Sequence, residues 1–229
     1  MGFTYLVSAN RTYYYIADYD LKRVFILNSN WSFISVRNFT FNPGYMITID
    51  DSIYMTTSSD IYKTDKNLII LKKSTLSSEY IGIYYNSTNK TIYAALALAN
   101  HIDIFDLKLN FLDFIDIGTK KPISLAGNII GLFIGTFDAT VILIVNKKIK
   151  ARFNGCDGFY TSIISLVIDQ YGYMANSCNT SGGPFISLYS LNGTFISLLP
   201  KRPGKSNYIG FDSNQKFVAI TSSKVFLYT

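Results

Sequence analysis

The sequence predicts an all-β protein, a six-bladed β-propeller with about 40 residues per blade and a sixth blade that lacks its outer strand. Three observations lead to this fold class. The composition is 48% hydrophobic, with 18 Tyr and 17 Phe in 229 residues, which favours strands over helices and excludes disorder. An aromatic residue followed two positions later by a small one recurs about every 40 residues. Each repeat holds short apolar segments separated by turn residues, as a propeller blade does.

The aromatic residue and its small partner mark each repeat. The pairs are Tyr15 with Ala17, Tyr54 with Thr56, Tyr93 with Ala95, Phe133 with Gly135, Tyr173 with Ala175, and Phe217 with Ala219. Propeller blades crowd together near the axis, where a small side chain admits the neighbouring sheet. We therefore expect the aromatic residues to be core between blades rather than a ligand-stacking ladder.

The strands follow the same order in every repeat. First strands are predicted at 5–9, 45–49, 80–85, 123–127, 163–169 and 208–212, and the marker pair lies on the second. Third strands are predicted at 23–27, 60–64, 101–105, 140–145, 185–189 and 224–228. Fourth strands are predicted at 31–36, 68–73, 111–117, 148–153 and 194–199. The sixth repeat reaches Thr229 without a fourth strand, which predicts an open strand edge at Val225, Phe226, Leu227 and Tyr228.

We expect one domain over residues 1–229, since this length suits a single propeller. Its blades are predicted at approximately 3–38, 43–75, 79–118, 122–154, 161–200 and 207–229. No apolar run approaches the ~20 residues that a membrane-spanning helix needs, so no membrane span is expected.

The first repeat carries the segment Tyr15–Asp18 followed by Arg23–Phe25, and the third carries Tyr93, Ala95 and Ile104–Asp106. These segments resemble the NHL-repeat family of six-bladed propellers, whose core is an aromatic, a small residue and Asp, then Arg and an apolar strand. The Asp and Arg are absent from the second to sixth repeats. The resemblance therefore implies a divergent NHL-like propeller, or another six-bladed family.

Asn-X-Ser/Thr sequons suggest a secreted glycoprotein. The seven are at Asn10, Asn30, Asn38, Asn86, Asn89, Asn179 and Asn192. Chance would give about three, so the excess predicts N-glycosylation and an extracellular location. The N-terminus has neither the basic start nor the apolar core of a signal peptide, so we expect a removed signal or a fragment.

Cys156 and Cys178 are the only cysteines, and with a single histidine they cannot form the usual four-ligand zinc site. A disulfide or two free thiols remain, and an oxidising compartment favours the disulfide. We expect Cys156 in the connector after the fourth blade and Cys178 in the loop between the second and third strands of the fifth. Such a link would join adjacent blades and stabilise by about 3 kcal/mol.

The connections of a blade alternate between two ends of its strands. Turns between first and second and between third and fourth strands would carry five sequons, at Asn10, Asn30, Asn86, Asn89 and Asn192, and the opposite end would carry Asn38 and Asn179. That opposite end would also carry a candidate basic binding face of Lys22, Arg23, Arg37, Lys72, Lys73, Lys120, Lys121, Lys201, Arg202 and Lys205. Few acids oppose them, among them Asp20, Asp60, Glu79 and Asp157. An acidic glycan, a sulfated polymer or an acidic protein would fit, and ordinary solvated lysines fit equally.

Candidates for catalysis are sparse. A metal-dependent propeller hydrolase needs converging carboxylates, Asn or His, and the inner strands offer Asn10, Asp50, Asp51, Asp169 and Asp212. Three of these end strands, where turn hydrogen bonding is usual. The single histidine, His101, is expected in a loop, and no nucleophile elbow is present. No catalytic residue, metal ligand or cofactor is therefore predicted.

Three functions remain open from the sequence. The first is a non-enzymatic extracellular glycoprotein that binds proteins or glycans. The second is a structural subunit of a filament or matrix that assembles by strand complementation at the open sixth blade. The third is a metal-dependent hydrolase or lyase. Nucleic acid is not expected as a partner, because no nucleic-acid-binding motif is visible.

Overall fold

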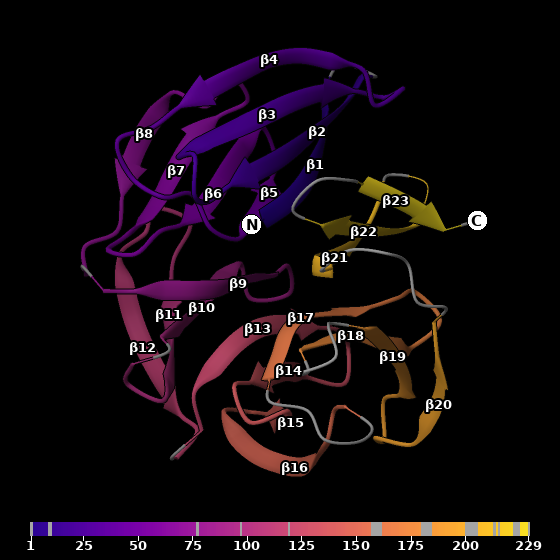
Figure 1. Ribbon diagram of the computed structural model, residues 1–229. Coiled ribbons are helices and arrows are strands. Elements are labelled where there is room, and N and C mark those ends of the chain that lie inside the picture. The colour runs from indigo at the N-terminus through magenta and orange to yellow at the C-terminus, as the bar shows by residue number, and fades with distance from the viewer. Residues whose placement is uncertain are drawn as a thin grey trace. The chain divides into compact units, whose positions relative to one another are not determined.

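The computed structural model describes residues 2–8, 11–76, 78–96, 98–118, 120–156, 162–179, 185–199, 206–212, 214, 216–221 and 225–228. All regular elements within these ranges are β-strands, which form five four-stranded sheets and one three-stranded sheet (Figure 1). The predicted all-β class is therefore confirmed. No described segment forms a helix of the length and apolar character that crossing a membrane requires.

The chain divides into two compact units. Unit 1 comprises Met1–Leu98 and Ile102–Phe114, and unit 2 comprises Ala99–His101 and Ile115–Thr229. The first three sheets lie essentially in unit 1. Their strands are β1 (Gly2–Ser8), β2 (Arg11–Asp18), β3 (Arg23–Asn28), β4 (Phe33–Asn38), β5 (Met46–Ile49), β6 (Ser52–Thr56), β7 (Ile61–Asp65), β8 (Ile70–Lys73), β9 (Tyr80–Asn86), β10 (Thr91–Leu96), β11 (His101–Phe105) and β12 (Phe111–Asp116).

Unit 2 contains the other three sheets. Their strands are β13 (Pro122–Gly127), β14 (Leu132–Thr136), β15 (Thr140–Val145), β16 (Lys148–Asn154), β17 (Ser162–Ile168), β18 (Tyr173–Asn179), β19 (Phe185–Ser190), β20 (Phe195–Leu198), β21 (Ser206–Phe211), β22 (Phe217–Thr221) and β23 (Val225–Tyr228). The sheet β21–β23 has three strands among the residues that the structure describes.

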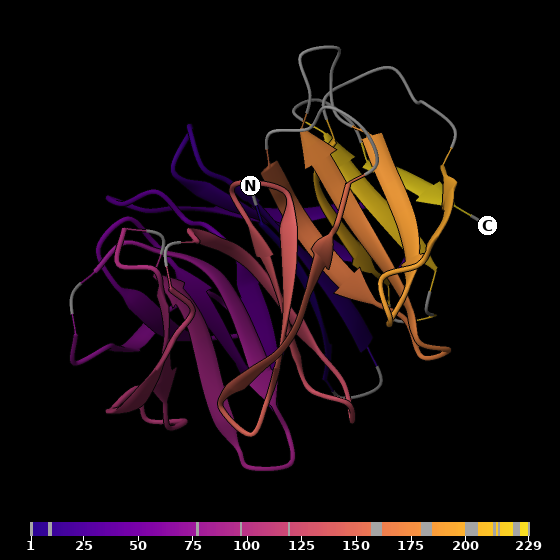
Figure 2. The same cartoon turned by 90° about the horizontal axis from the view of Figure 1, so that it is seen from below.

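Within every sheet the strand order follows the sequence, and each strand pairs antiparallel with the next (Figures 1 and 2). This chain of hairpins is the topology of a propeller blade. The strands begin and end close to their predicted positions, as β5 at Met46–Ile49 shows against a prediction of 45–49. The count of six blades stays a prediction.

A recurring turn connects many of these strands. The side-chain oxygen of Asn28, Asp65, Asp106, Asp169 or Asp212 accepts backbone N–H groups two and four residues later, at 2.7–3.0 Å. Such side-chain acceptors stabilise tight turns. They also offset the cost of a left-handed residue, since Trp31, Leu68 and Leu109 all have positive φ. Asp169 and Asp212 therefore serve as turn acceptors, the role that the sequence predicted for them.

Apolar cores fill the spaces between neighbouring sheets of unit 1. Tyr15, Val24 and Met55 belong to a buried cluster between the first two sheets, and Tyr54, Ile92 and Phe105 to one between the second and third. The hydroxyl groups of Tyr15 and Tyr54 each donate a hydrogen bond to the next sheet. Tyr15 donates to the backbone carbonyl of Lys66 at 2.9 Å, and Tyr54 to that of Leu107 at 2.9 Å. Each ring thus ties its own sheet to the turn between the third and fourth strands of the next.

Unit 2 is built in the same manner. Phe133 and Val141 pack with Ile163 and Met174 in a cluster between the fourth and fifth sheets. A Cβ added at Gly135 would lie 2.5 Å from Ser124 Oγ and 2.8 Å from Ile163 Cγ2. Only glycine fits this approach, which is the packing reason that the sequence predicted for the small residues.

The disulfide between Cys156 and Cys178 is present, and both cysteines are fully buried in the same cluster. It joins the end of the fourth sheet to the fifth. The predicted position of Cys178 was wrong: the residue lies within strand β18, opposite Ile163 of β17, and not in a loop. Strand β18 extends to Asn179 because it pairs with β17 up to that residue and with β19 up to Cys178.

The prediction that the six aromatic markers are core residues was wrong for Tyr173. Tyr15, Tyr54, Tyr93 and Phe133 are buried, as predicted. Tyr173 is 51% exposed, because it is the first residue of β18 and Met174 occupies the buried position beside it. Phe217 is half-buried and packs its ring edge-on against Phe211, with centroids 5.7 Å apart. The marker is thus a core residue only where it lies inside its strand.

Candidate functional site

A small pocket lies in unit 1 where several connections meet at one end of the strands. Its volume is about 160 Å³, and its lining residues are Tyr19, Gly44, Tyr45, Thr57, Ser58, Glu79, Tyr80 and Ile81. Tyr19 follows strand β2, Thr57 and Ser58 follow β6, and the other residues lie just before or at the start of β5 and β9. We call this site the tyrosine pocket.

Hydrogen bonds between side chains and the backbone hold the walls of the tyrosine pocket. Asn42 Nδ2 donates to the carbonyl of Tyr19 at 2.8 Å, which fixes the turn after β2. The Thr57 hydroxyl accepts the N–H of Asp60 at 3.0 Å and closes the turn after β6. The N–H of Tyr45 donates to Thr56 Oγ1 at 3.0 Å. The pocket is therefore built from connections that the sheets themselves position.

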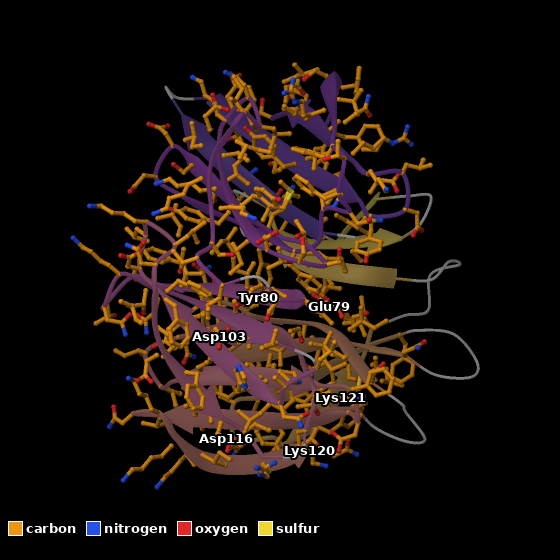
Figure 3. The ribbon with its side chains drawn as sticks, turned by 90° about the vertical axis from the view of Figure 1, so that its left-hand side faces the viewer. Glu79, Tyr80, Asp103, Asp116, Lys120 and Lys121 are labelled. Atoms are coloured by element: carbon orange, nitrogen blue, oxygen red, sulfur yellow. A yellow bond between two sulfur atoms is a disulfide. The ribbon has the colours of Figure 1, made fainter. Side chains whose placement is uncertain are left out.

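Two buried carboxylates contact residues that line the pocket: Asp103 contacts Tyr80, and Asp60 is hydrogen-bonded to Thr57 through its backbone. The Tyr80 hydroxyl donates to Asp103 Oδ2 at 2.7 Å, and both side chains are at most 2% exposed (Figure 3). Asp60 is also buried and lies 3.5 Å from Lys73 Nζ. Burial, the hydrogen bond to Asp103 and the charges of Asp103 and Asp60 all raise the pKa of the Tyr80 phenol. Both carboxylates are engaged, Asp103 by the Tyr80 hydroxyl and Asp60 by Lys73.

Glu79 adds a carboxylate at the pocket itself, next to Tyr80 (Figure 3). It is half-buried, and no ion pair to it is found among the residues that the structure describes. The chain as a whole carries a net charge of +6, so this concentration of negative charge is a local feature. A carboxylate beside tyrosine rings attracts cations and repels anions.

The predicted basic residues of unit 1 are partly neutralised. Arg23 forms an ion pair with Asp18 at 3.2 Å, and its guanidinium lies 4.7 Å from the centre of the Phe25 ring. Lys73 pairs with Asp60, and Lys72 donates to Asn110 Oδ1 at 3.3 Å. Lys22 and Arg37 are exposed. Asp18, which neutralises Arg23, was not among the acids expected to oppose the basic residues.

In unit 2, Lys120 pairs with Asp138, and Lys121 is exposed. Partial burial opposes ionisation of Asp138, but hydrogen bonds from Lys120, Thr136 and Thr140 outweigh it and lower the pKa to about 2. Lys201, Arg202 and Lys205 lie outside the described residues. The basic binding face stays a prediction.

The sequon asparagines fall at turns and strand ends. Asn30, Asn38, Asn89, Asn179 and Asn192 are exposed, Asn86 is half-buried, and Asn10 lies outside the described residues. In unit 1, Asn30, Asn86 and Asn89 lie at the strand ends opposite the tyrosine pocket, and Asn38 lies at the same end as the pocket. This is the alternation that the strand order predicts for each sheet.

The outer strands expose apolar side chains. Strand β4 shows Phe33, Ile34 and Val36, and β8 shows Ile70 and Leu71. Strands β12 and β20 do the same with Phe111, Leu112, Phe114, Phe195, Ile196 and Leu198. Exposed apolar edge strands are a feature that proteins usually cover or use in contacts with other molecules.

The candidates for metal chemistry do not converge. Asp50 and Asp51 are exposed in the turn between β5 and β6, Asp169 and Asp212 hold turns, and Asn10 lies outside the described residues. Within those residues, no group of three or more His, Cys, Asp or Glu side chains could hold a metal ion. His101 is the first residue of β11, not a loop residue as predicted, and its Nδ1 lies 3.0 Å from the carbonyl of Ala99.

Comparisons with known proteins identify the fold. A scan against protein-family models and a search of curated proteins found no match. Solved structures do match: the WD40 β-propeller domain of Doa1 aligns with a TM-score of 0.74 at 10% identity, over 99% of this chain and 77% of that chain. At this identity the likeness shows the fold alone, and the fold is a β-propeller. With 1236 solved chains matching, the fold selects no single function.

Replacing Tyr80 with phenylalanine tests the floor of the pocket. We expect Tyr80→Phe to lower the free energy of unfolding at pH 7 by about 1–3 kcal/mol, because the buried Asp103 carboxylate loses a donor. Since folding raises the pKa of Tyr80 above 10.0, its contribution is complete below pH 10 and declines as the pH rises further. Urea denaturation of both proteins across this range should therefore show their difference shrinking above pH 10.

The matched control is Tyr171→Phe, because Tyr171 is 79% exposed in a turn of unit 2. We expect no change in stability at any pH for this variant. A difference between wild type and Tyr80→Phe that stays constant from neutral to alkaline pH would show that the hydroxyl does not titrate against the buried carboxylates.

Proposed function

We propose that this protein is a secreted, N-glycosylated β-propeller that acts as a binding module for proteins or glycans and is not an enzyme. The excess of sequons carries the proposal, together with the exposure of five of their asparagines. The buried disulfide supports it, since disulfides persist mainly in oxidising compartments. The loop ends of the sheets and the exposed apolar outer strands supply surface for contacts.

The blade count and family are part of the same proposal. The sheet β21–β23 is the sixth blade, and the chain is a divergent NHL-like propeller. In support, the repeat of about 40 residues continues through Phe217 and Ala219, and Ala219 packs with Ala175 and Ile209 between the fifth and sixth sheets. This is the same inter-sheet contact that the earlier repeats make.

Glycan occupancy is the direct test of the secreted location. For protein from its native source, we expect enzymatic deglycosylation to lower the mass and to convert Asn30, Asn38, Asn89, Asn179 or Asn192 to aspartate in peptide mass spectra. Asn67 is an exposed asparagine outside any sequon and should stay unchanged, which controls for spontaneous deamidation. An unchanged mass would overturn the proposal of a secreted glycoprotein.

A second candidate function rests on the three-stranded sheet. Strand β23 pairs with β22, and the sheet order places no further strand beside it within the described residues. An open edge of this kind can accept a strand from another chain and so build a filament of head-to-tail subunits. Light scattering over a range of concentrations should then show particles that grow with concentration. A monomer at every concentration would argue against assembly and leave the binding module.

A further inference from the structure

We propose that the tyrosine pocket binds the end of one cationic side chain, lysine or arginine, presented by a protein partner. This inference rests on the proposed binding function and names the chemistry that one of its surfaces recognises. Three features of the pocket lead to it: its size, the rings and carboxylate that line it, and its access to solvent.

The size of the pocket limits what it can hold. Sites for whole small molecules usually measure about 300–1,000 Å³. A cavity of about 150 Å³ admits a group the size of benzene. The tyrosine pocket, at about 160 Å³, therefore accommodates the end of one side chain and not a complete metabolite.

The lining of the pocket favours positive charge. Tyr19 and Tyr45 contribute aromatic rings, and Glu79 contributes a carboxylate with no ion-pair partner among the described residues. Aromatic faces attract ammonium and guanidinium groups, and a carboxylate next to them adds a charge-assisted hydrogen bond. The negative charge of Glu79 would repel an anionic group from the same place.

The pocket is open to a partner. Tyr19 is 39% exposed, Ser58 is exposed and Glu79 is half-buried, so a side chain can enter from solvent. Lys73, in β8, is already paired with Asp60 and does not fill the position of the ligand. The surrounding connections are fixed by hydrogen bonds, which keeps the site formed before a ligand arrives.

The test uses two small probes of nearly equal shape and different charge. The cationic probe is Nα-acetyl-lysine N-methylamide, and the neutral one is Nα-acetyl-norleucine N-methylamide. NMR titration of the tyrosine ring signals should show saturable binding of the lysine probe with a Kd on the order of millimolar. The norleucine probe should bind at least about tenfold more weakly, because it offers no charge to Glu79 or the rings.

Variants locate the site. Glu79→Gln keeps the shape of the side chain and should weaken the lysine probe about tenfold or more. Tyr19→Ala should weaken it similarly, whereas Tyr19→Phe should keep most of the affinity because the ring remains. The control is Asp51→Asn, which removes an exposed acid from the turn at the other end of β5 and should leave binding unchanged. Circular dichroism of each variant confirms that it folds.

Two results would overturn the inference: equal binding of both probes, or a folded Glu79→Gln protein that binds the lysine probe as wild type does. The proposed function fails separately. If the glycosylated protein captures an extracellular partner equally well with and without Glu79, the proposed binding function holds and the inference about this pocket fails. If an unglycosylated protein binds the lysine probe through Glu79, the inference about the pocket holds and the proposed secreted location fails.

Discussion

Within each unit, close packing of a sheet's second strand against the neighbouring sheet is the contact on which the rest of the structure depends. Within unit 1, Tyr15 and Tyr54 are buried between sheets, and each also donates a hydrogen bond to a turn of the next sheet. Within unit 2, Phe133 and Gly135 take the corresponding place against Ile163. A four-stranded sheet alone exposes both faces, so these contacts supply most of the apolar burial that folding requires.

This construction leaves the connections free for recognition. Of the residues that line the pocket, Tyr80 and Tyr45 pack in or against the core between the second and third sheets, whereas Tyr19 and Glu79 are not part of it. Tyr19 and Glu79 can therefore supply an exposed ring and a carboxylate without an ion pair among the described residues at small cost to stability. Rigid scaffolds commonly place binding residues on loops for this reason. The tyrosine pocket is a site in unit 1 where rings, a carboxylate and a cavity coincide.

The sequence predicted what depends on neighbours along the chain. Alternating apolar residues and turn chemistry located the strands, and Asp169 and Asp212 were correctly read as turn residues. Pairing across the fold was harder to foresee. The contacts of Arg23 with Asp18 and of Tyr80 with Asp103 depend on which side chains face each other, and composition does not reveal that. The pocket was not predicted, because Tyr19 and Glu79 are far apart in sequence and only folding brings them together.

Tyr173 holds the aromatic position of the repeat but is not packed in a core. Tyr173 has the same position in its repeat as Phe133 has in the preceding one. Tyr173 begins its strand and is 51% exposed, whereas Phe133 is fully buried. Urea denaturation of Phe133→Ala and Tyr173→Ala therefore tests the central claim that inter-sheet burial, and not the repeat itself, stabilises the fold. We predict a loss of about 3–5 kcal/mol for Phe133→Ala and a change within about 0.5 kcal/mol for Tyr173→Ala. Equal losses for the two variants would contradict the account.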